Sequence, residues 1–340
     1  MIAYIVMTGS LPPDVCGVGD YSEALVRSLQ AGGSIAKTYY AKDWSFTSLF
    51  RHVSRLRKYE AGVLNIQYPT QGFGWSMVPV LLSLLIKPRR SVITLHEFSR
   101  RSPKAKCASY LFFLFSDWFI FTTPNERDFC CRIAPWIRGR SSVIPLASNI
   151  PLKSGEIRDI DIAYFGHIRP DKGLEEFIAV IDSIRHKSIF NVNVIGQTVP
   201  GFEEYSERVI AELKSVGANV ILNQPNERAA ELLSRTKVAL LPFPDGVTLR
   251  RGTALASMGN GALLITRAAA ENSEFDKVCI ALPAKNKIGP VLLQVLDHYG
   301  DFETVRSAGQ DFARSFSWSA IALSYIDVLK KVDSRFHKNS

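Results

Sequence analysis

The sequence predicts an α/β protein of two domains, each built on a doubly wound parallel sheet. Short apolar runs, which are typical of strands buried on both faces, alternate with segments of helical apolar spacing. The alternation stops in a polar stretch after Ala147 and then starts again, which indicates a linker and a second domain. A chain of 340 residues is long enough for two ordinary domains. We place the domains at residues 1–150 and 151–316, with a C-terminal helix at 317–335.

The first half opens with an apolar run, and strands and helices then follow in turn. The expected strands are Ile2–Met7, Val63–Gln67, Ser91–Leu95, Trp118–Thr122 and Ser142–Pro145. The expected helices are Tyr21–Gln30, Phe46–Lys58, Ser76–Ile86, Lys104–Phe115 and Asn125–Ile133. The run Ile35–Ala41 makes a poor strand because polar residues interrupt it.

The second half repeats the alternation. The expected strands are Ile160–Phe165, Phe190–Ile195, Asn219–Leu222, Val238–Pro242, Ala262–Thr266 and Val278–Ala281. The expected helices are Gly173–Ile184, Glu203–Val216, Glu227–Ser234 and Arg251–Asn260. Parallel sheets bind ligands at the carboxyl ends of their strands, so two such domains predict a ligand in the cleft between them.

Composition narrows the cellular setting. The longest internal apolar stretch, Met77–Ile86, is too short to span a membrane, and no basic region precedes the first apolar run. The five cysteines form no CxxC pair and have no zinc-like spacing with histidine. We therefore expect a cytoplasmic protein with reduced thiols and no metal site.

Charge is distributed unevenly along the chain. Residues 1–150 hold 18 of the 41 basic residues but only 9 of the 32 acidic ones, whereas the remainder is neutral. A basic half predicts an acidic partner such as anionic lipid, nucleic acid or a phosphorylated substrate. No helix-turn-helix, zinc-finger or RNA-binding signature is present, so we expect no nucleic acid.

The first candidate for chemistry is the segment Gly17–Ser22 after the first strand. Its pattern is close to GxGxxG, with Ser22 in the third glycine position, and it precedes a helix whose positive end suits a phosphate. A plain turn is the alternative for Gly17 and Gly19. A dinucleotide-binding domain would need an acidic residue about 20 positions on, for which only Asp43 is available.

Two further segments lie between a strand and a helix. In Gly166–Gly173, the cations Arg169 and Lys172 suit a diphosphate, because departure of a nucleoside diphosphate builds negative charge on its oxygens. In Pro244–Thr253, Arg251 and the backbone amides at the start of the next helix form a second candidate anion-binding site. A solvated turn is the alternative for both.

Several segments together resemble glycosyltransferase family four, a retaining family with the GT-B fold. They are Pro13 to Leu29, Thr94–Glu97, Val143 to Pro151, Tyr164 to Leu174 and Phe316–Ser319. The resemblance covers nearly the whole chain. It implies two Rossmann-like domains, the first binding the acceptor and the second the nucleotide-sugar, with the last helix crossing back to the first domain.

The chain departs from the family at one motif. Many members carry two glutamates eight positions apart, which hold the sugar and the ribose of the donor. Alignment on Gly261 places Thr248 and Ala256 at these positions, and neither is acidic. The chain resembles a branch with Arg-Arg-Gly-Thr here, at residues 250–253. Ala256 cannot accept a hydrogen bond from a ribose hydroxyl.

The resemblance implies transfer of a sugar with retained configuration, in which the leaving phosphate helps to deprotonate the acceptor. No protein nucleophile and no metal is then required, and the nucleotide-sugar is the only small-molecule partner besides the acceptor. The catalytic candidates are Arg169, Lys172 and His96. The donor-binding candidates are Gly17, Gly19, Thr248, Arg250, Arg251, Gly252, Thr253, Gln197 and Gln224. The acceptor-binding candidates are Asp20, Tyr21, His96 and Arg100; for Asp20 a helix N-cap, and for His96 a satisfied buried histidine, are the alternatives.

Two sequence features bear on the metal and on the acceptor. Asp159-Ile160-Asp161 spells the DxD of metal-dependent transferases, but it leads into a strand and so lies at the amino end, away from the ligand. Basic residues share helices with apolar ones around Arg51–Lys58 and Arg100–Phe115, which suits a membrane interface and a lipid-linked acceptor. Ordinary core helices with solvated faces are the alternative.

For the whole chain, the rival functions are a catalytically degenerate scaffold in polysaccharide assembly and a sugar-nucleotide epimerase.

Overall fold

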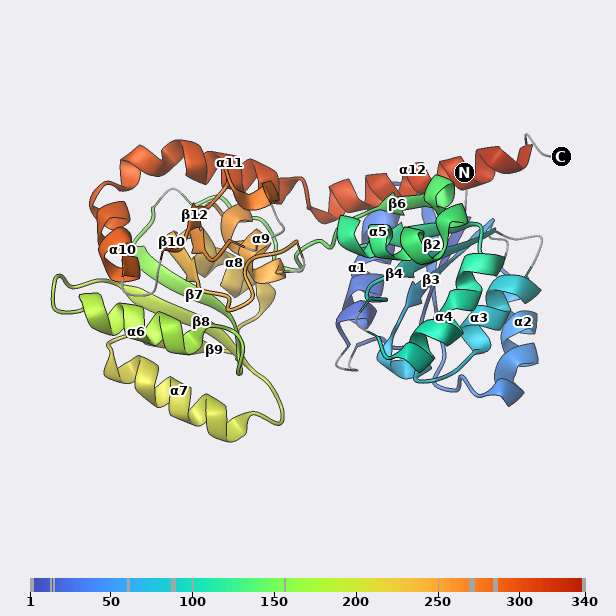
Figure 1. Cartoon of the computed structure of the whole chain (residues 1–340), viewed down its shortest axis with the longest axis horizontal. Helices are drawn as coiled ribbons and strands as arrows, with labels where there is room; N and C mark the ends of the chain where they lie inside the picture. The colour runs from blue at the N-terminus through green and yellow to red at the C-terminus, as the bar shows by residue number, and fades with distance from the viewer. Residues whose placement is uncertain are drawn as a thin grey trace. The chain divides into compact units, whose positions relative to one another are not determined.

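The computed structural model describes residues 3–12, 14, 16–59, 62–86, 90–99, 101–155, 157–249, 251–268, 273–283 and 287–337 (Figure 1). The chain divides into two compact units. Unit 1 comprises Met1–Leu146 and Trp318–Ser340, and unit 2 comprises Ala147–Ser317. Each unit is an α/β layer structure around one parallel sheet, which confirms the predicted fold class. None of the described helices is long and apolar enough to cross a membrane.

Unit 1 contains a six-stranded sheet in the order β2-β1-β3-β4-β5-β6, with every neighbouring pair parallel. Its strands are β1 (Ala3–Thr8), β2 (Ile35–Tyr40), β3 (Val63–Tyr68), β4 (Arg90–Leu95), β5 (Trp118–Phe121) and β6 (Ser141–Val143). The chain adds β2 on one side of β1 and all later strands on the other side. The reversal between β1 and β3 is the switch point of this sheet.

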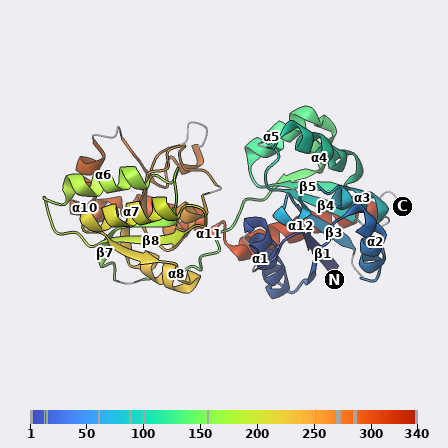
Figure 2. The same cartoon turned by 90° about the horizontal axis from the view of Figure 1, so that it is seen from below.

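Helices follow the strands of unit 1, and the last helix of the chain joins them (Figure 2). They are α1 (Gly17–Ala31), α2 (Leu49–Arg57), α3 (Val78–Leu85), α4 (Pro103–Phe115), α5 (Pro124–Ile133) and α12 (Trp318–His337). Ser102 and Thr123 cap α4 and α5 through their side chains, and a proline opens each helix. Helix α12 packs against α1 and buries an apolar stripe that includes Ile321, Val328 and Leu329.

Unit 2 contains a second six-stranded parallel sheet, in the order β12-β11-β10-β7-β8-β9. Its strands are β7 (Ile160–Ile168), β8 (Val192–Thr198), β9 (Asn219–Leu222), β10 (Thr236–Leu241), β11 (Leu263–Thr266) and β12 (Ile280–Ala281). Its helices are α6 (Leu174–Ile184), α7 (Glu203–Ser215), α8 (Asn226–Ser234), α9 (Gly252–Gly259), α10 (Ile288–Asp297) and α11 (Glu303–Arg314). Counted along the unit, this is the 3-2-1-4-5-6 order of dinucleotide-binding folds, with its switch point between β7 and β10.

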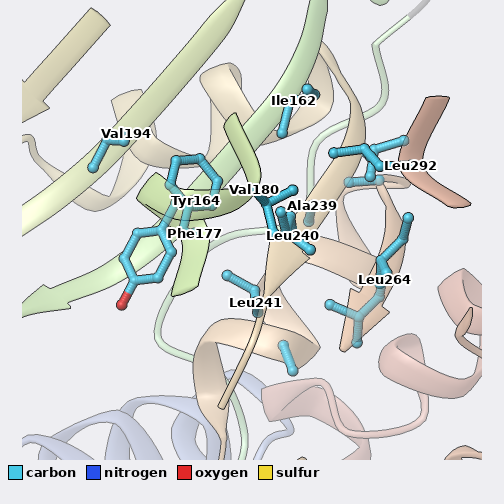
Figure 3. Packing of buried hydrophobic residues seen from close by; sticks show 14 of the residues in the cluster. Ile162, Tyr164, Phe177, Val180, Val194, Ala239, Leu240, Leu241, Leu264 and Leu292 are labelled. Carbon is cyan, nitrogen blue, oxygen red and sulfur yellow. The ribbon is translucent and has the colours of Figure 1, made fainter. Parts of the chain in front are cut away.

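The core of unit 2 is apolar up to the switch point. Figure 3 shows part of this cluster, in which Ile162 and Leu240 lie among other fully buried aliphatic side chains. Tyr164 lies beside Phe177, with ring centroids 5.5 Å apart, and its hydroxyl points away from the aliphatic residues. That hydroxyl donates to the backbone oxygen of Lys172 at 3.2 Å, so the core directly holds the loop between β7 and α6.

Some sequence predictions of individual elements are wrong. The glycine segment that follows β1 is not a loop: Gly17 and Gly19 lie in the first turn of α1, which Cys16 precedes in extended conformation. The weak run at Ile35 forms β2, because an edge strand that is partly exposed tolerates polar residues. The apolar spacing also assigned no helix between Ala281 and Phe316, where the structure has α10 and α11.

Candidate functional site

The switch point of unit 2 brings two loops together at the carboxyl ends of β7 and β10. The strands pair directly, as Val238 does with Ile162. Gly173 ends the first loop with φ +78°, and a Cβ there would lie 2.0 Å from the backbone oxygen of Pro242 in the second loop. The loops therefore touch, and only glycine fits at the contact.

The first loop carries Arg169 and Lys172 over the end of β7. Arg169 is partly buried, and its Nε has no hydrogen-bond partner among the described residues. Burial, followed by the nearby guanidinium groups of Arg251 and Arg169, lowers the pKa of Lys172 from its usual value to about 8. Both predicted cations thus lie in a site whose positive charge the protein leaves incompletely compensated.

The second loop brings Arg251 to the same site. Its backbone amide donates to the Thr248 oxygen at 2.8 Å, which forms the tight turn before α9. Its guanidinium donates to the carboxylate of Asp245 and lies over the Phe243 ring, with Cζ 4.5 Å from the centroid. Within the described part of the chain, Arg251 is the one of these three cations that forms an ion pair with a carboxylate.

The start of α9 completes the site. Within the described structure, a Cβ at Gly252 would meet nothing within 4 Å, so the Cα at the start of α9 borders open space. The Thr253 methyl lies 3.7 Å from a Cβ built on Gly166, which places the first turn of α9 against β7. These amides lie at the positive end of a helix and suit a phosphate. Arg250, the remaining predicted residue of this loop, lies outside the described residues.

The two predicted glutamines differ in their placement. Gln197 is opposite His167 in the register of β7 and β8. Because Lys172 and Arg169 act electrostatically on His167, Gln197 borders the cationic site. Gln224 follows β9, one strand further out, and its amide nitrogen bonds the Leu222 oxygen at 2.9 Å. No described contact brings Gln224 to the cations.

The burial of Ala256 explains why a glutamate is unfavourable at this position of the motif. Ala256 is fully buried in an apolar cluster with Ile160, Ile195 and Leu233. A glutamate there would bury a charge among aliphatic side chains, which is costly without a partner. Burial therefore disfavours a glutamate at this position.

In unit 1, the glycine segment is part of the packing of α1. A Cβ at Gly19 would lie 2.7 Å from the backbone oxygen of Ser10, so Gly19 allows the helix to approach the β1 loop. A Cβ at Gly17 would meet nothing within 4 Å in the described structure. Asp20 is not an N-cap, since Cys16 holds that position; burial and Glu23 raise the pKa of its carboxyl.

His96 lies at the carboxyl end of β4 and is 7% exposed. Its Nε2 is 2.8 Å from Oε1 of Gln67, and its ring meets Tyr21 edge to face at 5.0 Å. Tyr21 is buried, with its hydroxyl 3.3 Å from that of Tyr325, so we assign it to support of His96 rather than to contact with an acceptor. Arg100, the other predicted acceptor residue, lies outside the described residues.

The sequence patterns missed the groups that hold the His96 loop. Buried Glu126 accepts hydrogen bonds from the backbone amides of Phe98 and Ser99, at 3.1 and 3.0 Å. Thr122 donates to the His96 oxygen at 3.2 Å. The only prior signal was the Thr-Pro-x-Glu start of α5, which marks a helix cap rather than a site.

Several charged groups of the sequence prediction have structural partners. Arg90 pairs with Asp117 at 3.2 Å, and Arg101 lies over the Tyr68 ring at 4.8 Å. Asp159 pairs with Arg235, and Asp161 with Lys237 at 2.8 Å, both at the amino end of the sheet in unit 2. Among the described residues, no cluster of histidine, cysteine or carboxylate side chains could hold a metal ion.

A separate groove of about 810 Å³ runs along the edge strand β2. Its lining includes Lys37, Arg55, Lys58 and Tyr59. None of the predicted site residues lines it, so this groove is not part of the candidate site.

Several solved structures have a similar fold, and some of them are glycosyltransferases. Sucrose-phosphate synthase from Thermosynechococcus elongatus superposes with a TM-score of 0.69 at 17% identity, over 98% of this chain and 100% of the other. Anabaena Alr3699/HepE in complex with UDP gives a TM-score of 0.72 at 14% identity, over 97% and 100%. An alpha-glucosyltransferase in complex with UDP-glucose and DNA containing an abasic site gives 0.65 at 14% identity, over 97% and 99%.

The sequence matches no family model and no curated protein. Structural similarity at these identities carries the fold and not the activity. Two parallel sheets with these strand orders, matched along nearly the whole chain, give the chain the fold of the GT-B glycosyltransferases.

Proposed function

We propose that this chain is a glycosyltransferase that uses a nucleotide-diphosphate sugar. Arg169, Lys172 and Arg251 form the observation that carries the proposal. Three cations at the switch point of a nucleotide-binding sheet, one of them with an unpartnered buried Nε, require a ligand with several negative charges. A diphosphate supplies such charges in a compact group. The UDP and UDP-glucose in the similar structures support uridine diphosphate as the first nucleotide to test.

In the proposed reaction, the bond between the anomeric carbon and the diphosphate oxygen breaks, and the diphosphate leaves with the electron pair. Arg169 and Lys172 stabilise this developing charge. The acceptor oxygen attacks the same face of the sugar and gives its proton to the leaving phosphate, so configuration is retained. Gly252 and Thr253 hold the phosphates from the start of α9.

Unit 1 supplies the acceptor side of the proposal. His96 contacts the transferred sugar or the acceptor hydroxyl, and Gly17, which has no side chain, lets a ligand approach the first turn of α1 closely.

Unit 2 supplies further donor contacts. Thr248 contacts the donor sugar at the position where the family has glutamate. Gln197, next to the cationic site, contacts the nucleoside, while the structure gives Gln224 no support for that role.

We further propose a lipid-linked saccharide as acceptor, with unit 1 docked on the cytoplasmic face of an anionic membrane. Exposed aromatic side chains support this. Phe46, in the 3-10 turn before α2, is 69% exposed, and Phe50 in α2 is 77% exposed. Exposed Arg51, Arg55 and Arg57 lie on the same helix. Apolar side chains beside basic ones are typical of helices that lie in a membrane interface.

The test of donor binding is a thermal-shift titration with uridine, guanosine, adenosine and thymidine diphosphates in the presence of EDTA. A nucleotide at a hundred times its dissociation constant stabilises the protein by about 2.7 kcal/mol. We expect one nucleotide to give this shift in the wild type, and Arg169→Ala with Lys172→Ala to abolish it.

The matched control is Lys187→Ala with Lys214→Ala, which removes two exposed lysines of the same unit, one in the turn after α6 and one in α7. It changes net charge equally and should leave the shift intact. The titration is repeated with magnesium in place of EDTA. Absence of a shift with every nucleotide under both conditions would contradict the proposal and favour a non-catalytic scaffold. A shift seen only with magnesium would show that a metal is needed.

A further inference from the structure

Beneath His96, unit 1 contains a set of polar side chains in an otherwise apolar layer. Asn65 and Gln67 from β3, Thr94 from β4 and Tyr325 from α12 are each at most 1% exposed. Buried polar groups cost free energy unless they are hydrogen-bonded, and apolar residues would pack a helix on a sheet without that cost. Their presence under one histidine therefore calls for an explanation beyond packing.

These side chains form a continuous chain of hydrogen bonds. Gln67 and Thr94 face each other in the register of β3 and β4. Thr94 Oγ1 is 3.0 Å from Asn65 Nδ2, 3.4 Å from Gln67 Nε2 and 3.1 Å from the Tyr325 hydroxyl. Tyr325 thereby joins a helix at the end of the sequence to the strand ends that carry His96.

The chain fixes the direction of the Gln67 amide. Its nitrogen donates to Asn65 Oδ1 and to Thr94 Oγ1, so its Oε1 must face His96. An acceptor 2.8 Å from His96 Nε2 requires that this nitrogen carries the proton. The amide therefore selects one tautomer of the imidazole as well as its orientation.

Tyr325 and Tyr21 hold the far end of the chain. The Tyr21 hydroxyl donates to that of Tyr325, and the Tyr21 ring packs on both His96 and Trp318, each at 5.0 Å. Burial raises the pKa of both phenols, so both remain neutral at physiological pH. The network thus contains no charge, and its effect is on orientation rather than on proton supply.

We infer that Tyr325 is a positioning residue, which fixes the tautomer and orientation of His96 through Thr94 and Gln67. The importance of His96 rests on the proposed function, whereas its positioning does not. Without the Tyr325 hydroxyl, Thr94 Oγ1 loses one of its three described hydrogen-bond partners, and Asn65 and Gln67 remain. The Thr94 hydroxyl can then turn toward either amide, which releases the Gln67 amide from its present direction.

The test is the nitrogen NMR spectrum of protein labelled with ¹⁵N-histidine, with the signals of His96 identified from their loss in His96→Gln. In the wild type we expect one tautomer, protonated at Nε2. In Tyr325→Phe, which keeps the ring and removes only the hydroxyl, and in Thr94→Val, the Nδ1 and Nε2 signals should move toward each other. Donor binding in unit 2 should stay unchanged.

The control is Val332→Ala, which removes two methyl groups from the buried face of α12, two turns from Tyr325. It loosens the helix without touching the network and should leave the His96 signals in place. An unchanged spectrum in Tyr325→Phe would overturn the inference, as would an equal change in Val332→Ala.

Activity separates this inference from the proposed function. If the wild type transfers sugar, Tyr325→Phe should lower kcat by about tenfold with the KM of the donor unchanged. Altered His96 signals in a protein that transfers no sugar would support the positioning and contradict the proposed function. Unaltered His96 signals in Tyr325→Phe, together with sugar transfer by the wild type, would contradict the positioning and support the proposed function.

Discussion

The ammonium of Lys172 lies among guanidinium groups in a partly buried site, and its charge is therefore sensitive to pH. A pKa of about 8 means that the free protein loses this charge as pH rises through 8, while a diphosphate stays fully ionised. Nucleotide binding favours the protonated lysine. Its affinity should thus fall by about tenfold from pH 7 to pH 9.

Isothermal titration calorimetry with the best nucleotide across this range measures the effect. Lys172→Arg provides the control, because a guanidinium keeps its charge throughout. Its profile should be flat. A flat profile in the wild type, or an equal fall in Lys172→Arg, would show that another group governs binding.

The titration of His52 affects the stability of the folded protein. His52 is 1% exposed, stacks on Trp44 at 4.4 Å, and has Nδ1 2.7 Å from the Tyr39 hydroxyl. Burial lowers its pKa below the ordinary value, so the unfolded chain binds a proton that the folded one does not. The free energy of unfolding should therefore be at its full value above pH 6.5 and should decrease as the pH falls below 6.5.

Urea unfolding between pH 5 and pH 8 checks this, with His52→Gln as the comparison. The variant should be less stable at neutral pH but should lose less stability on acidification. An identical pH dependence in both proteins would assign the acid sensitivity to other groups.

At the scale of elements, the contact between the β7 and β10 loops depends on one backbone conformation. Gly173 has φ +78°, and its neighbour across the contact is the Pro242 carbonyl. Gly173→Ala should destabilise the protein by about 3 kcal/mol or more, since left-handed strain and a steric clash add together. It should also weaken nucleotide binding.

Gly201→Ala separates the two causes. Gly201 has φ +87° but open space around its Cα, so only the strain of about 1 kcal/mol applies. Urea unfolding of both variants gives the difference. Equal losses would mean that the loops do not touch in solution.

The elements also explain what the sequence could predict. Arg169, Lys172 and Arg251 were identifiable because a strand followed by a short loop and a helix places its loop at the carboxyl edge of a parallel sheet. Gln67, Thr94 and Tyr325 were not, because their contacts join positions up to 231 residues apart (Thr94 to Tyr325) and leave no local pattern. The glycine segment was misread as a loop because its pattern resembles a phosphate loop, whereas Gly19 serves helix packing.

At the scale of the whole molecule, the excess of basic residues lies in the first 150 positions, and that part also exposes Phe46 and Phe50. Phe46→Ser with Phe50→Ser should reduce affinity for anionic vesicles by at least about tenfold, because each aromatic ring removes apolar surface from water on binding. Donor binding should be unaffected. Sedimentation with phosphatidylserine vesicles measures the loss.

Ile189→Ser is the matched control, since Ile189 is fully exposed in unit 2. Vesicle binding that persists in the double variant, or that falls equally in the control, would remove the support for a membrane-bound acceptor.

The return of α12 to unit 1 has a consequence for how the protein is made. All six strands of the first sheet are synthesised before residue 150, yet Tyr325, which completes the hydrogen bonds beneath His96, follows after the whole of unit 2. Unit 2 can fold as soon as it leaves the ribosome, whereas unit 1 begins first and is completed last. A nascent chain therefore acquires the cationic site of unit 2 before His96 in unit 1 is held in place.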